Sequence, residues 1–302
     1  MTKIKYIPDC VRKSDMKVIT QAIPILMEYK NAGYKLTLRQ LHYQFVARDL
    51  APNKKTTYNK ICEAMRRGRM AGLIDWNAIE DRTRILRSRP QWDNPEAIIQ
   101  ACANQFHVDY WQNQEKRVEV WIEKDALLGV IEETCNNWDC SYFSCRGYPS
   151  ISELHETALR IKRFKEYGQG FTILYCGDHD PSGLDMGDYI TRSLQEFNAE
   201  FEFKRIALSI QQIEQYNLPP NTIKESDTRS SDYQKHYGNQ CWELDALLPR
   251  MLNFIIDLEI QCNINDREDF RLQREIEMEG RQQLYTVANN FDDALEYAET
   301  CA

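Results

Sequence analysis

Three acidic residues follow two apolar segments that have the length of buried strands. Glu123 comes directly after residues 118–122, and Asp178 and Asp180 come after residues 171–176. In α/β folds, active sites lie beyond the carboxyl ends of strands, and residues two apart in an extended segment point to one side. Carboxylate oxygens are the ligands that Mg²⁺ prefers. The spacing therefore predicts a Mg²⁺ site, with Mn²⁺ as the alternative ion, that could bind phosphate and neutralise charge during phosphoryl transfer.

A tyrosine and an arginine share the outer face of a predicted helix that begins after Thr37. Thr37 and Gln40 have the spacing of a capping box. The apolar residues that follow form one narrow stripe: Leu38, Leu41 and Phe45. On a helical wheel Tyr43 points about 150° away from the centre of this stripe, and Arg39 lies one turn before it on the same side. Tyrosines are most often ordinary core residues, but the wheel predicts that Tyr43 points away from the buried face of its helix.

Charge is distributed unevenly along the 302 residues, which carry a net charge of −8. Residues 1–90 contain 19 basic and 8 acidic side chains, a net charge of +11, whereas residues 91–302 carry −19. A basic first third joined to an acidic remainder is typical of a nucleic-acid-binding module attached to a second domain. Chance segregation of charge is the alternative explanation.

The cysteines and the apolar segments indicate a protein inside the cell. No two of the ten cysteines have the C-x2-C spacing of a zinc knuckle, so we expect reduced thiols in a reducing compartment. No apolar run reaches the roughly 18 residues of a transmembrane helix, and the N-terminal residues contain no apolar stretch of signal-peptide length. We expect no membrane contact and a cytoplasmic or nucleoid-associated location.

The first third of the chain has the pattern of a small helical domain. The expected elements are helices at 15–30 and from 38, a turn at 51–55, a third helix and a strand at 73–76. Asn77 and Glu80 form another capping pair, which would open an arginine-rich helix. Two helices, a turn and a following strand are compatible with a winged helix-turn-helix domain. We assign residues 1–110 to this domain, including a linker flanked by Pro90 and Pro95.

Strands and helices alternate in the second domain, which we assign to residues 111–302. The expected strands lie at 118–122, 141–145, 171–176 and 203–208. The expected helices between them lie at 126–135, 151–167 and 184–197. This alternation predicts an α/β fold with a mainly parallel sheet covered by helices. A polar surface loop is expected at 219–240, and a helical C-terminal extension at 243–262 and 266–299.

Several short segments together resemble the Toprim domain, a Rossmann-like fold. They are Ile-Glu123-Lys-Asp, Arg146-Gly-Tyr-Pro149 and Asp178-His-Asp180-Pro-Ser-Gly183, in the order that the family has them. The closest similarity is to the A subunit of topoisomerase VI and its meiotic relative, a transesterase that makes double-strand breaks. Glu243-Leu-Asp-Ala-Leu247 resembles a later segment of that group, and Arg39-Gln-Leu-His-Tyr43 resembles the helix that carries its nucleophilic tyrosine. The resemblance covers roughly residues 37–260; Gln40 and His42 depart from the family pattern.

The resemblance implies an enzyme that cleaves double-stranded DNA. Glu123, Asp178 and Asp180 would bind Mg²⁺, and Glu123 would also handle protons. Tyr43 would attack a backbone phosphate and hold the 5′ end, while Arg39 steadies the phosphate or the phenolate. Four basic side chains would supply salt-sensitive contacts to the DNA backbone: Lys60, Arg66, Arg67 and Arg69. The family also implies a homodimer in which Tyr43 meets the acids of the partner subunit, and a separate ATPase partner if strands are passed.

Other functions are compatible with the same residues. A hydrolytic Toprim nuclease would use a metal-activated water, with Tyr43 only positioning the DNA. A non-catalytic DNA-binding protein, or a Toprim protein that processes RNA or primers, would share most of these features. His179 lies between two expected metal ligands, but alternation points it to the opposite side, so we expect it to pack rather than to bind metal.

Overall fold

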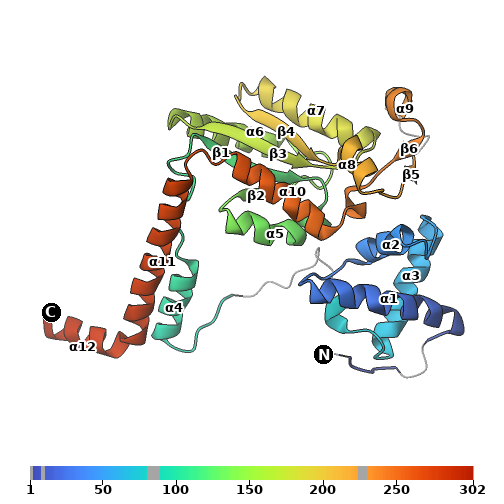
Figure 1. The fold of residues 1–302 in the computed structure, drawn as a ribbon. Coiled ribbons are helices and arrows are strands. Elements are labelled where there is room, and N and C mark those ends of the chain that lie inside the picture. The colour runs from blue at the N-terminus through green and yellow to red at the C-terminus, as the bar shows by residue number, and fades with distance from the viewer. Residues whose placement is uncertain (1–2, 8–10, 80–88, 224–229, 302) are drawn as a thin grey trace.

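The computed structural model describes residues 3–7, 11–79, 89–223 and 230–301. Figure 1 shows a cluster of N-terminal helices beside a larger α/β domain, from which a pair of C-terminal helices projects. We call residues 11–79 the N-terminal helical unit, and the sheet with its covering helices the α/β domain.

The N-terminal helical unit is built from helices around one apolar core. Its elements are α1 (Lys13–Asn31), α2 (Leu38–Ala47), α3 (Lys55–Met70) and the 3-10 helix η1 (Trp76–Ala78). The helix α2 begins as predicted, because Thr37 Oγ1 accepts from the Gln40 N–H (3.2 Å) and Gln40 Oε1 accepts from the Thr37 N–H (2.9 Å). This capping box satisfies two backbone donors at the start of the helix. The predicted stripe is also confirmed, since Leu41 and Phe45 lie in the core and Leu38 packs against it.

The expected strand at 73–76 is wrong. The Asp75 carboxylate accepts from the Asn77 N–H (3.0 Å), and this turn closes into η1 instead of extending. Extended pairing in the described part of this unit is limited to isolated bridges, Leu36 with Ile79 and Lys5 with Ala71. The helix expected to start from Asn77 and Glu80 falls mostly on residues outside those described.

The α/β domain contains the predicted parallel sheet. Its strands are β1 (Lys116–Ile122), β2 (Ser141–Ser144), β3 (Gly170–Cys176) and β4 (Glu202–Ala207), in the spatial order β2-β1-β3-β4 with every pair parallel. One face packs against α5 (Leu128–Asn137) and α10 (Pro249–Cys262), and the other against α6 (Ile151–Glu166) and α7 (Pro181–Glu196) (Figure 1). The central strands β1 and β3 are buried on both faces, as their continuous apolar runs require.

The polar stretch expected to be a loop at 219–240 contains regular structure. It holds β5 (Asn221–Thr222), α9 (Ser230–Tyr237) and β6 (Gln240–Cys241), with β5 and β6 antiparallel. Just before it lies α8 (Ile210–Gln215), and just after it the 3-10 helix η3 (Leu244–Ala246). The expected helix at 243–262 therefore begins later, at Pro249, because Pro occupies its first turn.

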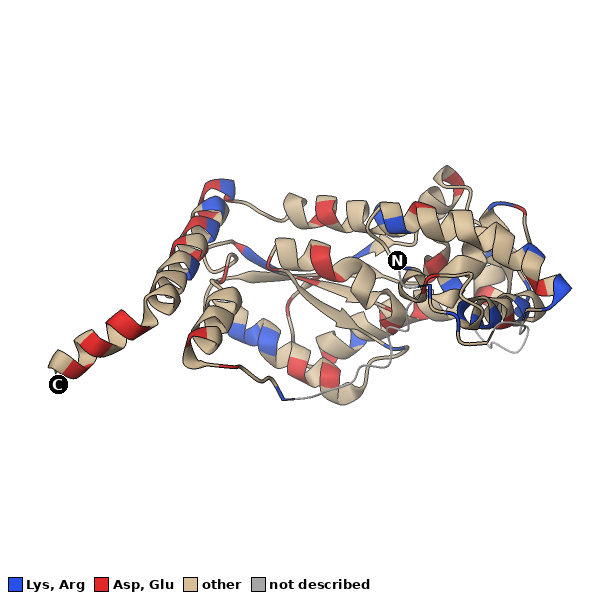
Figure 2. Ribbon diagram, turned by 90° about the horizontal axis from the view of Figure 1, so that it is seen from below, with Lys and Arg blue, Asp and Glu red and all other residues tan. Residues whose placement is uncertain are grey.

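The C-terminal helices form an arm that extends beyond the sheet. It consists of α11 (Arg267–Asn289) and α12 (Phe291–Cys301), and α4 (Pro95–Gln105) packs along α11. Arg281 Nε donates to the Phe106 carbonyl (3.0 Å), and Gly280 leaves the space that the Phe106 ring fills. Figure 2 shows acidic residues along α12 at the tip of the arm. The helix α4 thus packs with the C-terminal helices, although the sequence prediction placed its residues in the first domain.

The described cysteines differ in exposure, and Cys62 is partly buried. Cys135, Cys140, Cys145 and Cys176 are buried around the sheet, and burial raises the pKa of each thiol, to about 12 for Cys135 and Cys145. Cys102, Cys262 and Cys301 are exposed. The described cysteines form no disulfide, and none of the described residues belongs to a group of three or more Cys, His, Asp or Glu placed to hold a metal ion.

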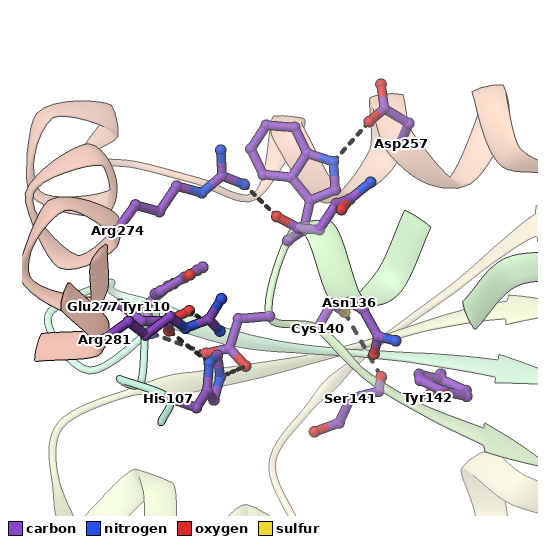
Figure 3. A pocket seen from close by; sticks show the side chains of 13 residues that line it. His107, Tyr110, Asn136, Cys140, Ser141, Tyr142, Asp257, Arg274, Glu277 and Arg281 are labelled. Atoms are coloured by element: carbon purple, nitrogen blue, oxygen red, sulfur yellow. Dashed lines mark hydrogen bonds and ion pairs between the residues drawn. The ribbon is translucent and has the colours of Figure 1, made fainter. Parts of the chain in front are cut away.

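A cavity of about 1000 Å³ lies where the arm meets the end of α5 and the start of β2 (Figure 3). Its ionic groups pair with one another. His107 Nε2 lies 2.6 Å from Asp139 Oδ1, and His107 Nδ1 lies 2.7 Å from Glu277 Oε2. Burial lowers the pKa of His107, but the hydrogen bonds and charges of Asp139 and Glu277 outweigh it, so its pKa is raised above 6.5.

This raised pKa predicts a pH-dependent attachment of the arm. The protonated ring stabilises the fold below about pH 6.5, and this contribution is lost as the pH rises through the raised pKa. We expect His107→Gln to lower the free energy of unfolding by about 0.5–1 kcal/mol at pH 5.5 and by less at pH 9. The loss is small because solvent screens the partly exposed ring. Urea denaturation at both pH values measures this, with the exposed His155→Gln as control. An equal loss at the two pH values would contradict the prediction.

Candidate active site

The three predicted acids lie together at the carboxyl edge of the sheet. Glu123 follows β1, and its Oε2 accepts from the Asp178 N–H (2.8 Å). Burial raises the pKa of Glu123, and the nearby charge of Asp180 raises it further. Asp178 is 5% exposed, and burial, opposed by Lys124 and reinforced by Glu123, raises its pKa to about 7. The strand ends therefore bring the predicted carboxylates close enough to influence one another.

Asp180 has a local structural role as well. It is the N-cap of α7, and its Oδ1 accepts from the Gly183 N–H (2.6 Å). Pro181 occupies the first turn, where a missing N–H costs nothing. A Cβ at residue 183 would overlap the Asp178 carbonyl, so only glycine fits there. The segment Asp178–Gly183 is thus a tight strand-to-helix connection that leaves both carboxylates at the edge of the sheet.

Lys124 is a residue of this site to which the sequence pattern assigned no role. Its Nζ lies 2.9 Å from Asp178 Oδ1, 3.0 Å from Glu243 Oε2 and 2.8 Å from Asp245 Oδ2. Burial lowers the pKa of Lys124, but these three carboxylates outweigh it and hold the ammonium charged. Two features of the sequence could have indicated its role: Lys124 directly follows Glu123, and Glu243 and Asp245 have a Glu-x-Asp spacing.

The helix α2 presents Arg39 to the same carboxylates. Arg39 Nε donates to Glu243 Oε2 (3.1 Å), and Arg39 Nη2 donates to Glu243 Oε1 (2.5 Å). Arg39 Nε also lies 3.7 Å from Asp245 Oδ2. Burial raises the pKa of Glu243, but Lys124 and Arg39 outweigh it and lower that pKa to about 2. Glu243 is therefore ionised at physiological pH. It pairs with Lys124 of the α/β domain and with Arg39 of the N-terminal helical unit.

Tyr43 lies on the same face of α2, as predicted, and the Arg39 guanidinium carbon is 5.8 Å from the centre of its ring. Tyr43 packs in the core of the α/β domain and not in the core of the N-terminal helical unit. It points away from its own unit but is only 2% exposed, because the second domain covers it. Burial, reinforced by the charge of Glu243, raises the pKa of the phenol, so it is neutral at physiological pH.

Asn221 completes a continuous polar connection between Tyr43 and the acids. Its Nδ2 donates to Tyr43 Oη (3.1 Å) and to Glu243 Oε1 (3.1 Å). Glu243 contacts Lys124, which contacts Asp178. Asn221 lies in the stretch that the sequence predicted to be a polar surface loop. The site therefore joins a tyrosine, two cations and a carboxylate cluster across the interface of the two domains.

The acids are carboxylates, the type of ligand that a hard divalent cation takes, but among the described residues no group of three is placed to hold an ion. Asp245 Oδ1 is buried and has no hydrogen-bond partner among the described residues, and the pKa values of Glu123 and Asp178 are raised. Each of these features indicates that too little positive charge and too few donors lie near the carboxylate oxygens. Lys124 supplies part of that charge, and Glu123, Asp178 and Asp180 are the residues that would hold the ion.

The four basic residues of α3 differ in their surroundings. Lys60 and Arg66 are exposed, and Arg66 pairs with Glu63 at 2.7 Å. Arg67 is 9% exposed and pairs with Asp15 of α1 at 2.7 Å, so it is not presented at the surface as the expected contact to the DNA backbone would require. Arg69 is partly buried against Trp76.

His179 packs as predicted. It is 4% exposed, its Nδ1 lies 2.8 Å from Tyr233 Oη, and its ring contacts Tyr237 and Trp242.

No protein-family model and no curated protein matches this chain. None of the helices in the described ranges is long and apolar enough to cross a membrane.

The position of Lys124 predicts a large and specific loss of stability. Lys124→Met leaves three carboxylates without their shared cation and should lower the free energy of unfolding by about 3 kcal/mol. The same change at the other end of β1, Lys116→Met, removes an exposed pair with Glu202 and should cost less than about 1 kcal/mol. Urea denaturation of both variants measures the difference. Similar losses in the two variants would show that Lys124 is not the counterion of this cluster.

Proposed function

We propose that this protein cleaves the backbone of double-stranded DNA in a metal-dependent reaction, with Tyr43 as the nucleophile. The observation that carries the proposal is the polar connection from Tyr43 through Asn221, Glu243 and Lys124 to Asp178. It brings a phenol to a carboxylate cluster at the carboxyl edge of a parallel sheet. The resemblance of the same residues to the Toprim domain and to the tyrosine helix of the topoisomerase VI A subunit supports it.

The chemistry assigns a separate role to each residue. The Tyr43 oxygen forms a bond to phosphorus, the bond from phosphorus to the 3′ oxygen breaks, and the DNA keeps a 5′ phosphotyrosyl end. Glu123 takes the phenolic proton, and the leaving 3′ oxygen acquires a proton. Mg²⁺ or Mn²⁺, held by Glu123, Asp178 and Asp180, would neutralise charge on the phosphate. Arg39 stabilises the phosphate or the phenolate through a charge-assisted contact.

The burial of Tyr43 adds a step before cleavage. At 2% exposure Tyr43 is out of reach of a DNA phosphate, so α2 must first separate from η3 and β5. Beside the packing of Tyr43 in the α/β core, three polar contacts hold them: Arg39 with Glu243, Tyr43 with Asn221, and Asn53 with the Pro220 carbonyl. Phosphate is a natural competitor for Arg39, because guanidinium groups bind phosphate and carboxylate alike. Separation also removes the burial and the Glu243 charge that raise the pKa of the phenol above its ordinary value.

The N-terminal helical unit supplies DNA binding in this proposal. It belongs to the segment of net charge +11, and we propose that α2 and α3 serve as the DNA-binding helix pair that a winged-helix domain would have. Lys60 and Arg66 are exposed on α3 and suited to the DNA backbone. Passage of one duplex through another would need a separate ATPase partner.

Hydrolysis is the second candidate, and the neutral, buried phenol favours it. In that case a metal-activated water attacks the phosphate, and Tyr43 positions the DNA. The two reactions differ in their product, because only transesterification leaves protein on the DNA. A protein that binds DNA but cleaves it under no metal condition would instead be a DNA-binding module.

The function is tested by the products of labelled supercoiled DNA with Mg²⁺ or Mn²⁺ on a denaturing gel, before and after proteinase treatment. We expect cleaved DNA with protein on its 5′ ends and no such product from Tyr43→Phe. Glu123→Gln and Asp178→Asn should each lose activity and weaken divalent-metal binding in calorimetry. Tyr216→Phe serves as the matched control for the tyrosine. Protein-free ends with full activity in Tyr43→Phe would establish hydrolysis instead.

A mixing experiment tests whether the site forms within one chain or between two. In a single chain Tyr43 reaches its own carboxylate cluster, whereas the family resemblance implies a homodimer with crossed sites. Tyr43→Phe and Glu123→Gln, each inactive alone, should recover nicking when mixed if the sites are crossed, because one composite site then has both residues. A mixture that demonstrably exchanges subunits and stays inactive would establish the arrangement within one chain.

A further inference from the structure

A second feature of the N-terminal helical unit lies on a side of α2 that the α/β domain does not cover. It is a pocket of about 390 Å³ between the start of α2, the outer part of α3 and η1. Its wall is apolar at Leu38 and Met65, and its polar side is formed by Arg69, Trp76 and the ion pair of Arg66 with Glu63. Tyr43 does not line it, so a ligand can enter without separation of the two domains.

Two buried donors in this pocket have no acceptor. They are Arg69 Nε and Trp76 Nε1, neither of which has a hydrogen-bond partner among the described residues. An unsatisfied buried N–H is destabilising, so folded proteins rarely keep one without a water or ligand. Two such donors on side chains that touch each other indicate an acceptor that binds both.

The Arg69 guanidinium is held in place before any ligand arrives. Its carbon lies 4.4 Å from the centre of the Trp76 ring, and Arg69 Nη2 donates to the Trp76 carbonyl (3.3 Å). No carboxylate pairs with Arg69 in the described ranges, in contrast to Arg67, which pairs with Asp15 and Glu63. Arg69 is therefore a partly buried cation that its two contacts with Trp76 hold in place.

We propose that this pocket binds a backbone phosphate of double-stranded DNA, an inference that rests on the proposed function. A phosphate oxygen is an anionic acceptor, which matches the two N–H donors and the charge of Arg69, while Arg66 in the same lining pairs with Glu63. The apolar wall at Leu38 and Met65 provides a surface for the adjoining sugar. Because Tyr43 remains covered while this pocket is open, DNA binds here first and α2 separates from the α/β domain afterwards.

The experiment measures duplex DNA binding by the full chain at several salt concentrations, using fluorescence anisotropy without divalent metal. Arg69→Gln should weaken binding and reduce the slope of log K against log salt by about one, the value for one lost phosphate contact. Trp76→Phe keeps the ring and the charge but removes Nε1–H, so it should weaken binding up to about tenfold with an unchanged slope. Matched controls are Arg48→Gln, whose arginine pairs with Glu28, and the exposed Trp92→Phe; both should bind like wild type. Circular dichroism melts confirm that each variant is folded.

Three outcomes are distinguishable. If wild type binds DNA but Arg69→Gln and Trp76→Phe match their controls, the pocket assignment is overturned while the proposed function stands. If wild type binds inorganic phosphate in calorimetry but no duplex DNA, both the DNA assignment and the proposed function fail. If duplex RNA binds more tightly than DNA with the same dependence on Arg69, the pocket is a phosphate site for RNA and the assignment to DNA is overturned.

Discussion

The crowding of carboxylates at the carboxyl edge of β1 and β3 is the constraint on which the rest of the site depends. Carboxylates that are close and buried raise one another's pKa, and the fold tolerates them only with cations among them. Lys124 supplies one cation from within the α/β domain and contacts three of the acids. Arg39 supplies another from α2. The electrostatics of the acidic cluster are therefore completed by the neighbouring domain.

This sharing gives α2 two partners. Its apolar stripe belongs to the core of the N-terminal helical unit, while Tyr43 belongs to the core of the α/β domain. A short helix that serves two cores fixes the orientation of the domains and of the tyrosine together. The tyrosine face combines this core packing with hydrogen bonds and ion pairs, and a phosphate can replace only the polar part. The contacts that stabilise the closed arrangement of the two domains are thus the same contacts that keep the tyrosine inaccessible.

The sequence was informative wherever a local pattern determines the structure. Apolar runs located the strands of the parallel sheet, the capping residues located the start of α2, and the helical wheel gave the direction of Tyr43. It was uninformative where partners lie far apart in the chain: Arg39 meets Glu243 across 204 positions. Local patterns also misled, since Arg67 turns inward to Asp15 and residues 73–76 close into a turn. Periodicity states which way a side chain points, but not which distant residue will cover it.

The distribution of the thiols makes the arm accessible to spectroscopy. The thiols around the sheet are buried with raised pKa values, so they are slow to form the thiolate that maleimides require. The exposed Cys102, Cys262 and Cys301 lie on α4, at the end of α10 and at the end of α12. Among the described cysteines, a spin label or fluorophore would therefore attach preferentially at these exposed positions, which bracket the arm, while Cys62 is partly buried in the N-terminal helical unit. Distances between such labels would report how far the projecting helices move relative to the sheet, with no engineered cysteine in the chain.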